Sequence, residues 1–445
     1  MLEVEVVPTS ELGDRSYVAH DGQSAIVVDP QRDVDRILRV LERLHLECVV
    51  VLETHIHNDY VTGGHALARA TGAEYVVAAS DEVLFERRSV RDGDTLRAGS
   101  MTIHVVATPG HTEGHLAFVV SVDSQRPVVF TGGSLLYGSV GRTDLVDSDR
   151  VDELSRAQYR SVRRLADQLT DDTPVYPTHG FGSFCSSGSS AGGDESTIGV
   201  ERLRNDALVT VSEDDFVSKL IAGLTSYPSY YAHMAPLNRE GPGAFVFTTP
   251  QLLSVEELLE RAKKGEWVVD LRSRTAYAAR HLEGTVSIEF GDNFSTYFGW
   301  LLPWGAPVNL IGESAGQVEE AQRQLSRIGV DEVAGACTAL EGADSSANFR
   351  HFDRATFADL ADSAGATILD VRRNDEVARG SIEGAVHIPL DSLLGRLEEL
   401  PPGRLWVHCA SGFRASIAAS LLDRAGRDVV LIDDDFSNAQ AFVGK

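Results

Sequence analysis

Three histidine-bearing strings in the first half of the chain constrain its fold more than any other feature. Residues 48–52 (CVVVL) predict a buried strand that runs straight into residues 54–59 (THIHND). His111 in ATPGHTEGH and His179 in VYPTHG also lie on predicted strand-end loops. Such loops hold neutral imidazoles on rigid supports, which a divalent-metal or iron centre requires. The sequence therefore predicts an α/β fold with a metal site, for which the candidate ligands are His55, His57, Asp59, His111 and His179.

Other local signals organise the N-terminal part of the chain. Residues 25–28 (AIVV) predict a strand, and Asp33 is the expected N-cap of the helix that follows. Residues 183–197 are rich in Gly and Ser and predict a surface loop near the histidine site. Cys185 in that loop is either a small loop residue or an acceptor of sulfane sulfur. Residues 227–243 contain three prolines and show no periodicity, so we expect a linker between domains there.

A weak internal repeat follows the expected linker. Residues 268–288 (VVDLRSRTAYAARHLEGTVSI) and 368–388 (ILDVRRNDEVARGSIEGAVHI) share an apolar strand, Asp-x-Arg, a short helix and Glu-Gly-x-Val before a second strand. Two such units in tandem indicate duplicated α/β domains. Together with the N-terminal part they give about three domains, the number expected for a chain of this length.

Cys409 is the cysteine with a chemically distinctive setting. It follows the apolar residues 405–407 and opens the string CASGFR, which ends at Arg414 and leads into a predicted helix over 415–425. Loop N–H groups, the helix N-terminus and Arg414 should together lower the pKa of the thiol and stabilise a thiolate or persulfide. Cys409 and Arg414 are the predicted catalytic residues. The loop residues expected to contact substrate are Ser411, Gly412 and Phe413.

The charge and the cysteine content exclude several classes of partner. The formal net charge of −26 disfavours nucleic acids and anionic membranes as partners. No apolar run is long enough to span a bilayer, and the N-terminus lacks the basic region of a signal peptide. The four cysteines are far apart, so a disulfide framework is not expected. These features predict a cytoplasmic protein.

The histidine strings resemble those of the metallo-β-lactamase superfamily, and in particular its persulfide dioxygenase branch, over residues 1–235. This resemblance implies an αββα sandwich. It also implies one ferrous ion, held by two histidines and an aspartate, that serves the oxidation of a low-molecular-weight thiol persulfide to sulfite by dioxygen. By motif, the iron histidines would be His55 and His111. The strings that carry the resemblance are THIHNDYVTGG (54–64), TPGHTEGH (108–115), FTGGSLLYGSVGRTDL (130–145) and STIGVERLRN (196–205).

The third ligand of that site departs from the pattern, because Gly133 stands where the branch carries its aspartate. The sequence leaves three replacements open: His57 in a three-histidine zinc-type site, Asp59 or Asp144, or an exogenous anion. Three states of the site stay open. The resemblance implies Fe(II), the first alternative is Zn(II), and the second is a site that no longer holds metal. A second metal is not expected, because Tyr60 occupies the position where dinuclear hydrolases of this fold carry histidine.

Arg142, in the string GRTD, has two interpretations. Its planar guanidinium could contact a carboxylate or persulfide of the substrate, because arginine offers two parallel donors. It could equally form a structural ion pair with Asp144 or Asp147.

Residues 349–445 resemble the rhodanese family. The supporting strings are ILDVR (368–372) and GSIEGAVHIP (380–389), and the Cys-to-Arg loop has the length associated with sulfur transfer. Ser381 departs from the family, where a histidine is usual. Residues 248–347 carry the same framework, but their loop at 311–317 (IGESAGQ) has Glu313 or Ser314 near the place of the cysteine. We therefore expect two rhodanese domains with parallel sheets, the first an inactive spacer.

The whole layout resembles persulfide dioxygenase–rhodanese fusions with an inactive middle domain. It implies a sulfurtransferase that acts through Cys409, with a thiol persulfide, thiosulfate or sulfite as its small-molecule partners. The same resemblance is compatible with a homo-oligomer. One alternative is a zinc-dependent thioester hydrolase of the glyoxalase II type. The other is a non-enzymatic partner that delivers sulfur from Cys409 to another protein.

Overall fold

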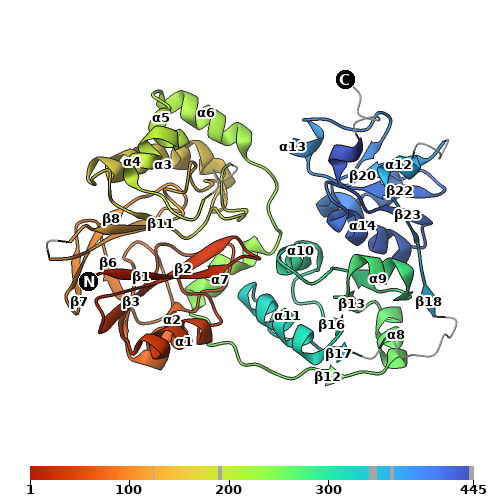
Figure 1. The fold of residues 1–445 in the computed structure, drawn as a ribbon, viewed down its shortest axis with the longest axis horizontal. Coiled ribbons are helices and arrows are strands. Elements are labelled where there is room, and N and C mark those ends of the chain that lie inside the picture. Colours follow the sequence, from red (N-terminus) through yellow and green to blue (C-terminus); the bar gives the residue numbers. More distant parts are fainter. Residues whose placement is uncertain (124, 189–192, 339, 341–347, 361–364, 440–445) are drawn as a thin grey trace. The chain divides into compact units, whose positions relative to one another are not determined.

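The computed structural model describes residues 1–123, 125–188, 193–338, 340, 348–360 and 365–439. The chain forms two compact units, Met1–Val246 with Leu325–Gly329, and Phe247–Gln324 with Val330–Lys445 (Figure 1). Within the described ranges, no helix is both long and apolar enough to cross a membrane.

The N-terminal unit contains two β-sheets. In the first, the strands are adjacent in chain order; β1 to β3 pair antiparallel and β3 to β6 pair parallel. Its strands are β1 (Glu3–Thr9), β2 (Asp14–His20), β3 (Ser24–Val28), β4 (Glu47–Leu52), β5 (Glu74–Ala78) and β6 (Arg88–Val90). The second sheet has the order β11-β10-β9-β8-β7. Its strands are β7 (Thr95–Ala98), β8 (Met101–Ala107), β9 (Leu116–Val122), β10 (Val128–Gly132) and β11 (Val175–Pro177).

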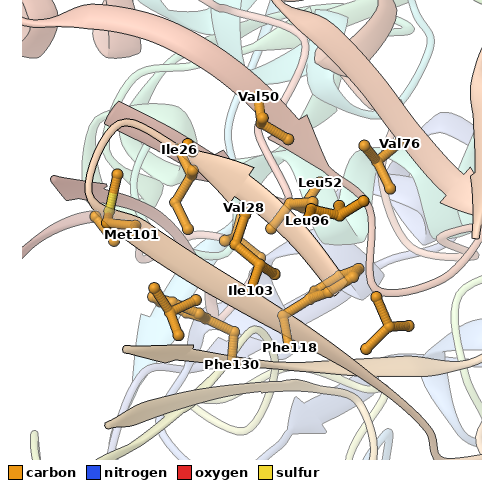
Figure 2. Close-up of a cluster of buried hydrophobic side chains, with 14 of the residues drawn as sticks. Ile26, Val28, Val50, Leu52, Val76, Leu96, Met101, Ile103, Phe118 and Phe130 are labelled. Atoms are coloured by element: carbon orange, nitrogen blue, oxygen red, sulfur yellow. The ribbon is translucent and has the colours of Figure 1, made fainter. Parts of the chain in front are cut away.

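The inner faces of the two sheets share one apolar core. Alternate residues of β3, β4 and β5 meet those of β8, β9 and β10, and Figure 2 shows Ile26, Val28, Ile103, Phe118 and Phe130 packed together. Helices cover both outer faces: α1 (Asp35–Leu44) and α2 (Gly64–Thr71) lie on the first sheet, and α3 (Val151–Asp167) and α6 (Glu213–Gly223) on the second. The predicted αββα sandwich is confirmed. Two short helices, α4 (Ile198–Arg204) and α5 (Asp206–Val209), lie between α3 and α6 in sequence.

The predicted strand at 25–28 is confirmed as β3, but the cap of the following helix differs from the prediction. Helix α1 begins at Asp35 with Val34 at the N-cap position, and Val34 makes no side-chain cap hydrogen bond. Asp33 is buried and pairs with Arg36, with 2.8 Å between Oδ2 and Nε. Its carboxylate is therefore neutralised by a side chain and does not cap the helix.

The expected linker at 227–243 contains a helix, α7 (Tyr231–Glu240), although Pro236 lies inside it. Asn238 of α7 is buried and donates through Nδ2 to the carbonyls of His57 (2.9 Å) and Tyr60 (2.8 Å). Its Oδ1 accepts from the Thr62 amide at 2.9 Å. These tertiary hydrogen bonds stabilise a helix that local sequence signals do not predict.

Replacing Asn238 by alanine should therefore destabilise the N-terminal unit. Two carbonyls and one amide of the histidine loop would lose their partner, and we expect a loss of about 2–3 kcal/mol. Urea unfolding of the full chain measures this loss. Glu240→Ala on the same helix is the matched control, because Glu240 is exposed. An unchanged midpoint for Asn238→Ala would show that α7 does not hold the loop.

The C-terminal unit contains two five-stranded parallel sheets with the same topology, β12-β17-β16-β13-β15 and β19-β23-β22-β20-β21. This confirms the predicted parallel sheets. The first is built from β12 (Gln251–Leu252), β13 (Trp267–Asp270), β15 (Val286–Ser287), β16 (Val308–Ile311) and β17 (Gly335–Cys337). The second is built from β19 (Asp353–Ala355), β20 (Thr367–Asp370), β21 (Val386–His387), β22 (Leu405–His408) and β23 (Val429–Ile432). β14 (His281–Leu282) and β18 (Phe349–Arg350) form a separate antiparallel pair.

Helices follow most of these strands. In the first half of the unit they are α8 (Val255–Lys263), α9 (Arg274–Ala279), α10 (Phe294–Leu301) and α11 (Ala315–Arg327). In the second half they are α12 (Phe357–Leu360), α13 (Asn374–Val377) and α14 (Phe413–Arg424).

The Asp-x-Arg motif of the repeat forms the same buried ion pair in both halves. Arg272 donates from Nη2 to Asp270 Oδ2 at 2.7 Å, and Arg372 donates to Asp370 at 2.6 Å. In each copy the same Nη2 also donates to a backbone carbonyl eight residues further on, at 2.9 and 2.8 Å. The repeat therefore reflects two copies of one structural unit.

Candidate metal centre and sulfur-transfer site

The histidine strings meet at one edge of the two sheets. β4 leads into residues 53–59, and the turn between β8 and β9 carries His111. β11 is parallel to β10 and leads into Thr178 and His179. Strand ends that share an edge of an α/β sheet bring their loops together, which is where such folds place binding residues.

His55, His111 and His179 form a compact buried trio. Each offers one ring nitrogen, and these atoms all lie within 4.8 Å of one another. The Nε2 atoms of His55 and His179 are 3.3 Å apart. Nε2 of His111 is buried and has no hydrogen-bond partner among the described residues. An orphaned imidazole nitrogen that faces two others fits a divalent metal ion, because neutral nitrogen donors are what zinc and iron sites use.

Hydrogen bonds at the opposite ring nitrogens orient His55 and His111. The Thr54 hydroxyl donates to Asp29 at 2.7 Å, so it accepts from Nδ1 of His55 at 2.9 Å. His111 donates from Nδ1 to the Arg142 carbonyl at 2.7 Å. In both rings the proton is therefore on Nδ1, and Nε2 keeps a lone pair that can bind a metal ion. Burial lowers the pKa of His111 to about 3 and that of His55 well below its ordinary value, so both rings are neutral.

His179 lies between two buried carboxylates. Its Nδ1 is 2.8 Å from Asp14 Oδ1 and 3.2 Å from Asp59 Oδ2. Burial opposes the charged form, but Asp59 and Asp14 outweigh it and raise the pKa of His179 well above its ordinary value. A metal ion at Nε2 would have to replace the proton there, with the Nδ1 proton kept by Asp14.

His57 lies in a different environment from the trio. Its Nε2 is 2.9 Å from the Tyr60 hydroxyl, 3.2 Å from Glu53 and 3.3 Å from Asp29. Despite burial, Asp29 and Glu53 raise the pKa of His57 to about 9. In the described part of the chain, ligand atoms of His57 meet those of Asp59 and His179, or of Asp29 and Glu53. The sequence left His57 open as one of three replacements for the missing ligand, whereas the structure places a nitrogen of His179 beside those of His55 and His111.

Gly133, at the position of the missing aspartate, lies against the His111 ring. A Cβ atom there would be 2.7 Å from Nε2 of His111, and one at Gly141 would be 2.7 Å from its Nδ1. The ring therefore fills the space between two glycines. An aspartate could therefore not replace Gly133 unless the His111 ring moved.

Gly133→Ala should consequently destabilise the N-terminal unit. The added methyl group overlaps a ring that the Arg142 carbonyl holds in place, and overpacking of this kind costs about 1–3 kcal/mol. Urea unfolding of the purified variant measures the loss, with Gly243→Ala as control because nothing lies within 4 Å of its built Cβ. Equal stability of the two variants would show that His111 shifts freely.

Arg142 is buried and its donors are engaged by the protein. Nε and Nη2 each lie 2.7 Å from the Asp144 carboxylate. Nη1 donates to the Phe184 carbonyl at 3.1 Å, and Nη2 to that of Thr225 at 2.8 Å. The guanidinium also lies over the ring of Tyr227. Of the two roles that the sequence left open, the ion pair with Asp144 is present, and it also occupies the carboxylate that could have served as a metal ligand.

The Gly- and Ser-rich segment is less exposed than expected. Ser183 and Cys185 are buried, while residues 189–192 lie outside the described ranges. Burial raises the pKa of the Cys185 thiol well above its ordinary value, and nearby Asp59 adds to the effect. A protonated buried thiol is a poor nucleophile, which favours the structural interpretation of Cys185.

Cys409 lies directly after β22 and four residues before the start of α14. The sequence predicts this order of apolar segment, cysteine loop and helix. The thiol is buried, Ser411 is exposed and Phe413 is half-buried. Gly412 adopts φ +88°, and a Cβ atom there would collide with the Asp433 carboxylate. Only glycine allows this turn without strain. The helix begins at Phe413, two residues earlier than predicted.

Arg414 is held by an acidic partner that the sequence did not reveal. Its two terminal nitrogens lie 2.5 and 2.7 Å from the Glu376 carboxylate. Although burial opposes the charged form, Arg414 lowers the pKa of Glu376. Glu376 lies on α13, just after the second Asp-x-Arg motif. Burial lowers the pKa of Arg414, but the pair with Glu376 holds the guanidinium in place and raises this pKa. Tyr297 and the Cys409 thiol also raise this pKa, which places the guanidinium near the thiol.

The first half of the C-terminal unit has glycine at the position that Cys409 occupies in the second half. Strand pairing matches Asp270 with Ile311 in the first sheet and Asp370 with His408 in the second. The residues that follow are Gly312 and Cys409. The sequence placed Glu313 or Ser314 near this position, and the strand register corrects that prediction by one or two residues.

This half also contributes to the Cys409 site and is not only a spacer. Tyr297 of α10 lies edge-on to Phe413, with 5.5 Å between ring centroids. Tyr297, Trp300 and Arg414 line one small pocket together with Arg373. Two further contacts hold α14: His281 pairs with Asp423 at 3.2 Å, and the Ser287 amide donates to Ser420 at 2.9 Å. Arg274 also pairs, at 2.7 Å, with Asp433, which follows β23 and lies against Gly412.

The sequence matches two known families. Residues 12–179 match the Metallo-beta-lactamase superfamily, and residues 353–441 match the Rhodanese-like domain. A hydroxyacylglutathione hydrolase from Cupriavidus taiwanensis is 32% identical over 190 residues, covering 41% of this chain and 68% of that protein. The human mitochondrial persulfide dioxygenase ETHE1 is 29% identical over 208 residues, covering 46% of this chain and 72% of that protein. A solved metallo-beta-lactamase from Staphylococcus aureus subsp. aureus COL has a TM-score of 0.67 and 27% identity, covering 76% of this chain and 98% of that one.

These likenesses agree with the geometry of both sites. The superfamily fold and its His/Asp groups support a divalent metal ion, without separating iron from zinc. The rhodanese-like domain and the persulfide dioxygenase relative support sulfur-containing small molecules as substrates. The chain therefore belongs to the metallo-beta-lactamase superfamily and is a fusion of such a domain, related to persulfide dioxygenases, with a C-terminal rhodanese-like domain.

Proposed function

We propose that the protein is a sulfurtransferase whose nucleophile is Cys409. The observation that carries the proposal is the turn between β22 and α14, where Gly412 shapes the loop and the Glu376-bound Arg414 lies near the thiol. The Cys409 thiolate attacks the sulfane sulfur of thiosulfate, and the S–S bond of thiosulfate breaks. Sulfite leaves with the electron pair and Cys409 becomes a persulfide. A thiolate or cyanide acceptor then takes the outer sulfur and regenerates the Cys409 thiolate.

The N-terminal unit is the proposed partner in this chemistry, with a divalent ion held by His55, His111 and His179. When bound, such an ion supplies Lewis acidity toward a sulfur or carbonyl ligand. Thr54 and the Arg142 carbonyl orient two of the rings, and Asp14 orients the third. Under this proposal the metal domain acts on a low-molecular-weight thiol persulfide and shares that intermediate with Cys409.

A second candidate for the metal domain is a thioester hydrolase. Three converging histidine nitrogens are a zinc-type donor set, and the hydroxyacylglutathione hydrolase relative supports this alternative. Metal analysis combined with two assays separates the candidates. Bound iron with oxygen uptake on a thiol persulfide favours the dioxygenase, whereas bound zinc with thioester cleavage favours the hydrolase.

The domain organisation of the proposal follows the predicted boundaries. Residues 1–235, extended to the end of α7 at Glu240, form the metal domain. Residues 248–347 form the rhodanese-like domain without a cysteine, and residues 349–445 form the domain that carries Cys409.

Sulfur loading of the wild-type protein tests the proposal directly. After incubation with thiosulfate and removal of the excess, intact-mass analysis should show a gain of one sulfur atom, and peptide mapping should place it on Cys409. Cyanide should remove this sulfur as thiocyanate in a single turnover. A protein that gains no sulfur from thiosulfate or from a small-thiol persulfide would refute sulfur transfer.

A further inference from the structure

Gln158 is a buried side chain that bonds to the two loops on either side of the His111 ring. It lies on α3, one of the helices that cover the second sheet of the N-terminal unit. Its Oε1 accepts from the His111 amide at 2.9 Å, and its Nε2 donates to the Ser134 carbonyl at 2.6 Å. Because Ser134 follows Gly133, one side-chain amide connects the loop of the candidate ligand His111 with the loop of Gly133.

The packing around Gln158 leaves its amide group little freedom to move. A Cβ atom at Gly110 would lie 2.2 Å from Gln158 Oε1 and 2.5 Å from the Gln158 Cα atom. The turn that carries His111 therefore lies directly on α3, and a glycine at position 110 allows this close approach. Gln158 is fully buried, so bulk water does not compete for either of its hydrogen bonds.

The place of the His111 ring depends on the relative position of these two loops. The ring lies between Gly133 and Gly141, and its Nδ1 donates to the Arg142 carbonyl. A shift of one loop against the other would move Nε2 of His111 away from the nitrogens of the other two histidines in the trio. Residues that hold a metal ligand in place affect metal affinity without touching the ion.

A side-chain amide is suited to this position because it offers one acceptor and one donor group at the same time. The acceptor meets the His111 amide and the donor meets the Ser134 carbonyl. A carboxylate would offer acceptors only, and a thioether would offer no donor.

We propose that Gln158 is a positioning residue of the metal centre, which sets the place of His111 by bonding its backbone amide and the Ser134 carbonyl with one side-chain amide. The inference rests on the proposed function, because it assumes a divalent ion at the histidine trio. It goes beyond that function by assigning a role to a helix that supplies no ligand to the trio.

Metal affinity of the full-length protein tests this role. Gln158→Met keeps the length of the side chain and removes the donor, so affinity for Zn(II) and Co(II) should fall about 10- to 100-fold in competition with a chelator. The visible absorption spectrum of bound Co(II) should change as well, because it depends on the arrangement of the ligands. Gln158→Asn is the milder second variant. It keeps an amide that is too short to bond both loops, and it should lower the affinity about 10-fold.

Val162→Ala is the matched control, because Val162 is a buried residue of the same helix that packs in the apolar core. It should destabilise the N-terminal unit in urea unfolding and leave metal affinity and the Co(II) spectrum unchanged. This control separates positioning from stability, since a residue that only stabilises the fold would not alter the spectrum of the bound ion.

Two results would overturn the inference alone: wild-type affinity and spectrum in both Gln158 variants, or an equal loss of affinity in Val162→Ala. A wild-type protein that binds neither Zn(II) nor Co(II) would refute the metal centre and the inference with it. Sulfur loading of Cys409 is measured separately and needs no metal ion, so failure of sulfur transfer is distinguishable from all of these results.

Discussion

Replacing Cys409 by serine is expected to abolish transfer of sulfur from thiosulfate to cyanide, with a loss in kcat of about 10³-fold or more, the scale seen when a catalytic nucleophile is removed. A hydroxyl group cannot form the persulfide through which the reaction runs. The loss should appear equally in the intact-mass experiment, where the variant should gain no sulfur. Thiocyanate formation under steady-state conditions provides the rate.

Cys337→Ser is the matched control, because Cys337 is a buried cysteine at the end of β17 in the same unit. It should retain wild-type transfer. Glu376→Gln should lower the rate by about 10-fold, because it releases Arg414 from a charge-assisted pair. Transfer that persists in Cys409→Ser would assign the nucleophile elsewhere and remove the main support for the proposed function.

Replacing His179 by asparagine is expected to lower the affinity for a divalent metal ion by more than about 100-fold, since loss of a ligand should exceed the effect of its supporting residues. The side chain supplies one of three converging nitrogens, and Gly133 offers no substitute. Metal content after dialysis and competition with a chelator measure the affinity. Near-UV circular dichroism checks that the variant remains folded.

Two further variants distinguish the trio from a site in which His57 is the third ligand. Asp14→Asn should weaken metal binding about 10- to 100-fold, because Asp14 orients the His179 ring. His57→Asn should have the smaller effect, since its Nε2 already contacts Tyr60, Glu53 and Asp29. Full metal content in His179→Asn together with loss in His57→Asn would restore His57 as the third ligand.

Much of the fold could be predicted because its signals are local. The apolar runs that became β3, β4 and β22 lie where the sequence places them, since a buried strand is a short continuous apolar segment. The repeat around Asp270 and Asp370 was visible as a shared string. Helix α7 was not predicted, because Pro236 and the lack of periodicity argue against a helix, and tertiary contacts such as those with the histidine loop stabilise it.

The candidate sites likewise contain residues that the sequence could identify and residues that it could not. Cys409, Gly412 and Arg414 are adjacent in the chain, so one string contains the whole loop and the sequence suffices to identify it. Glu376 lies on another element, and nothing in its own neighbourhood marks it as the partner of Arg414.

By itself, the sequence determined which strand-end loops carry the histidines and which loop carries the reactive cysteine, because those features are properties of short contiguous segments. Only the tertiary structure decided which histidine joins His55 and His111. Both His57 and His179 are candidates in the sequence, but the carboxylates around them differ. Asp14 and Asp59, which surround His179, are both distant from it in the chain.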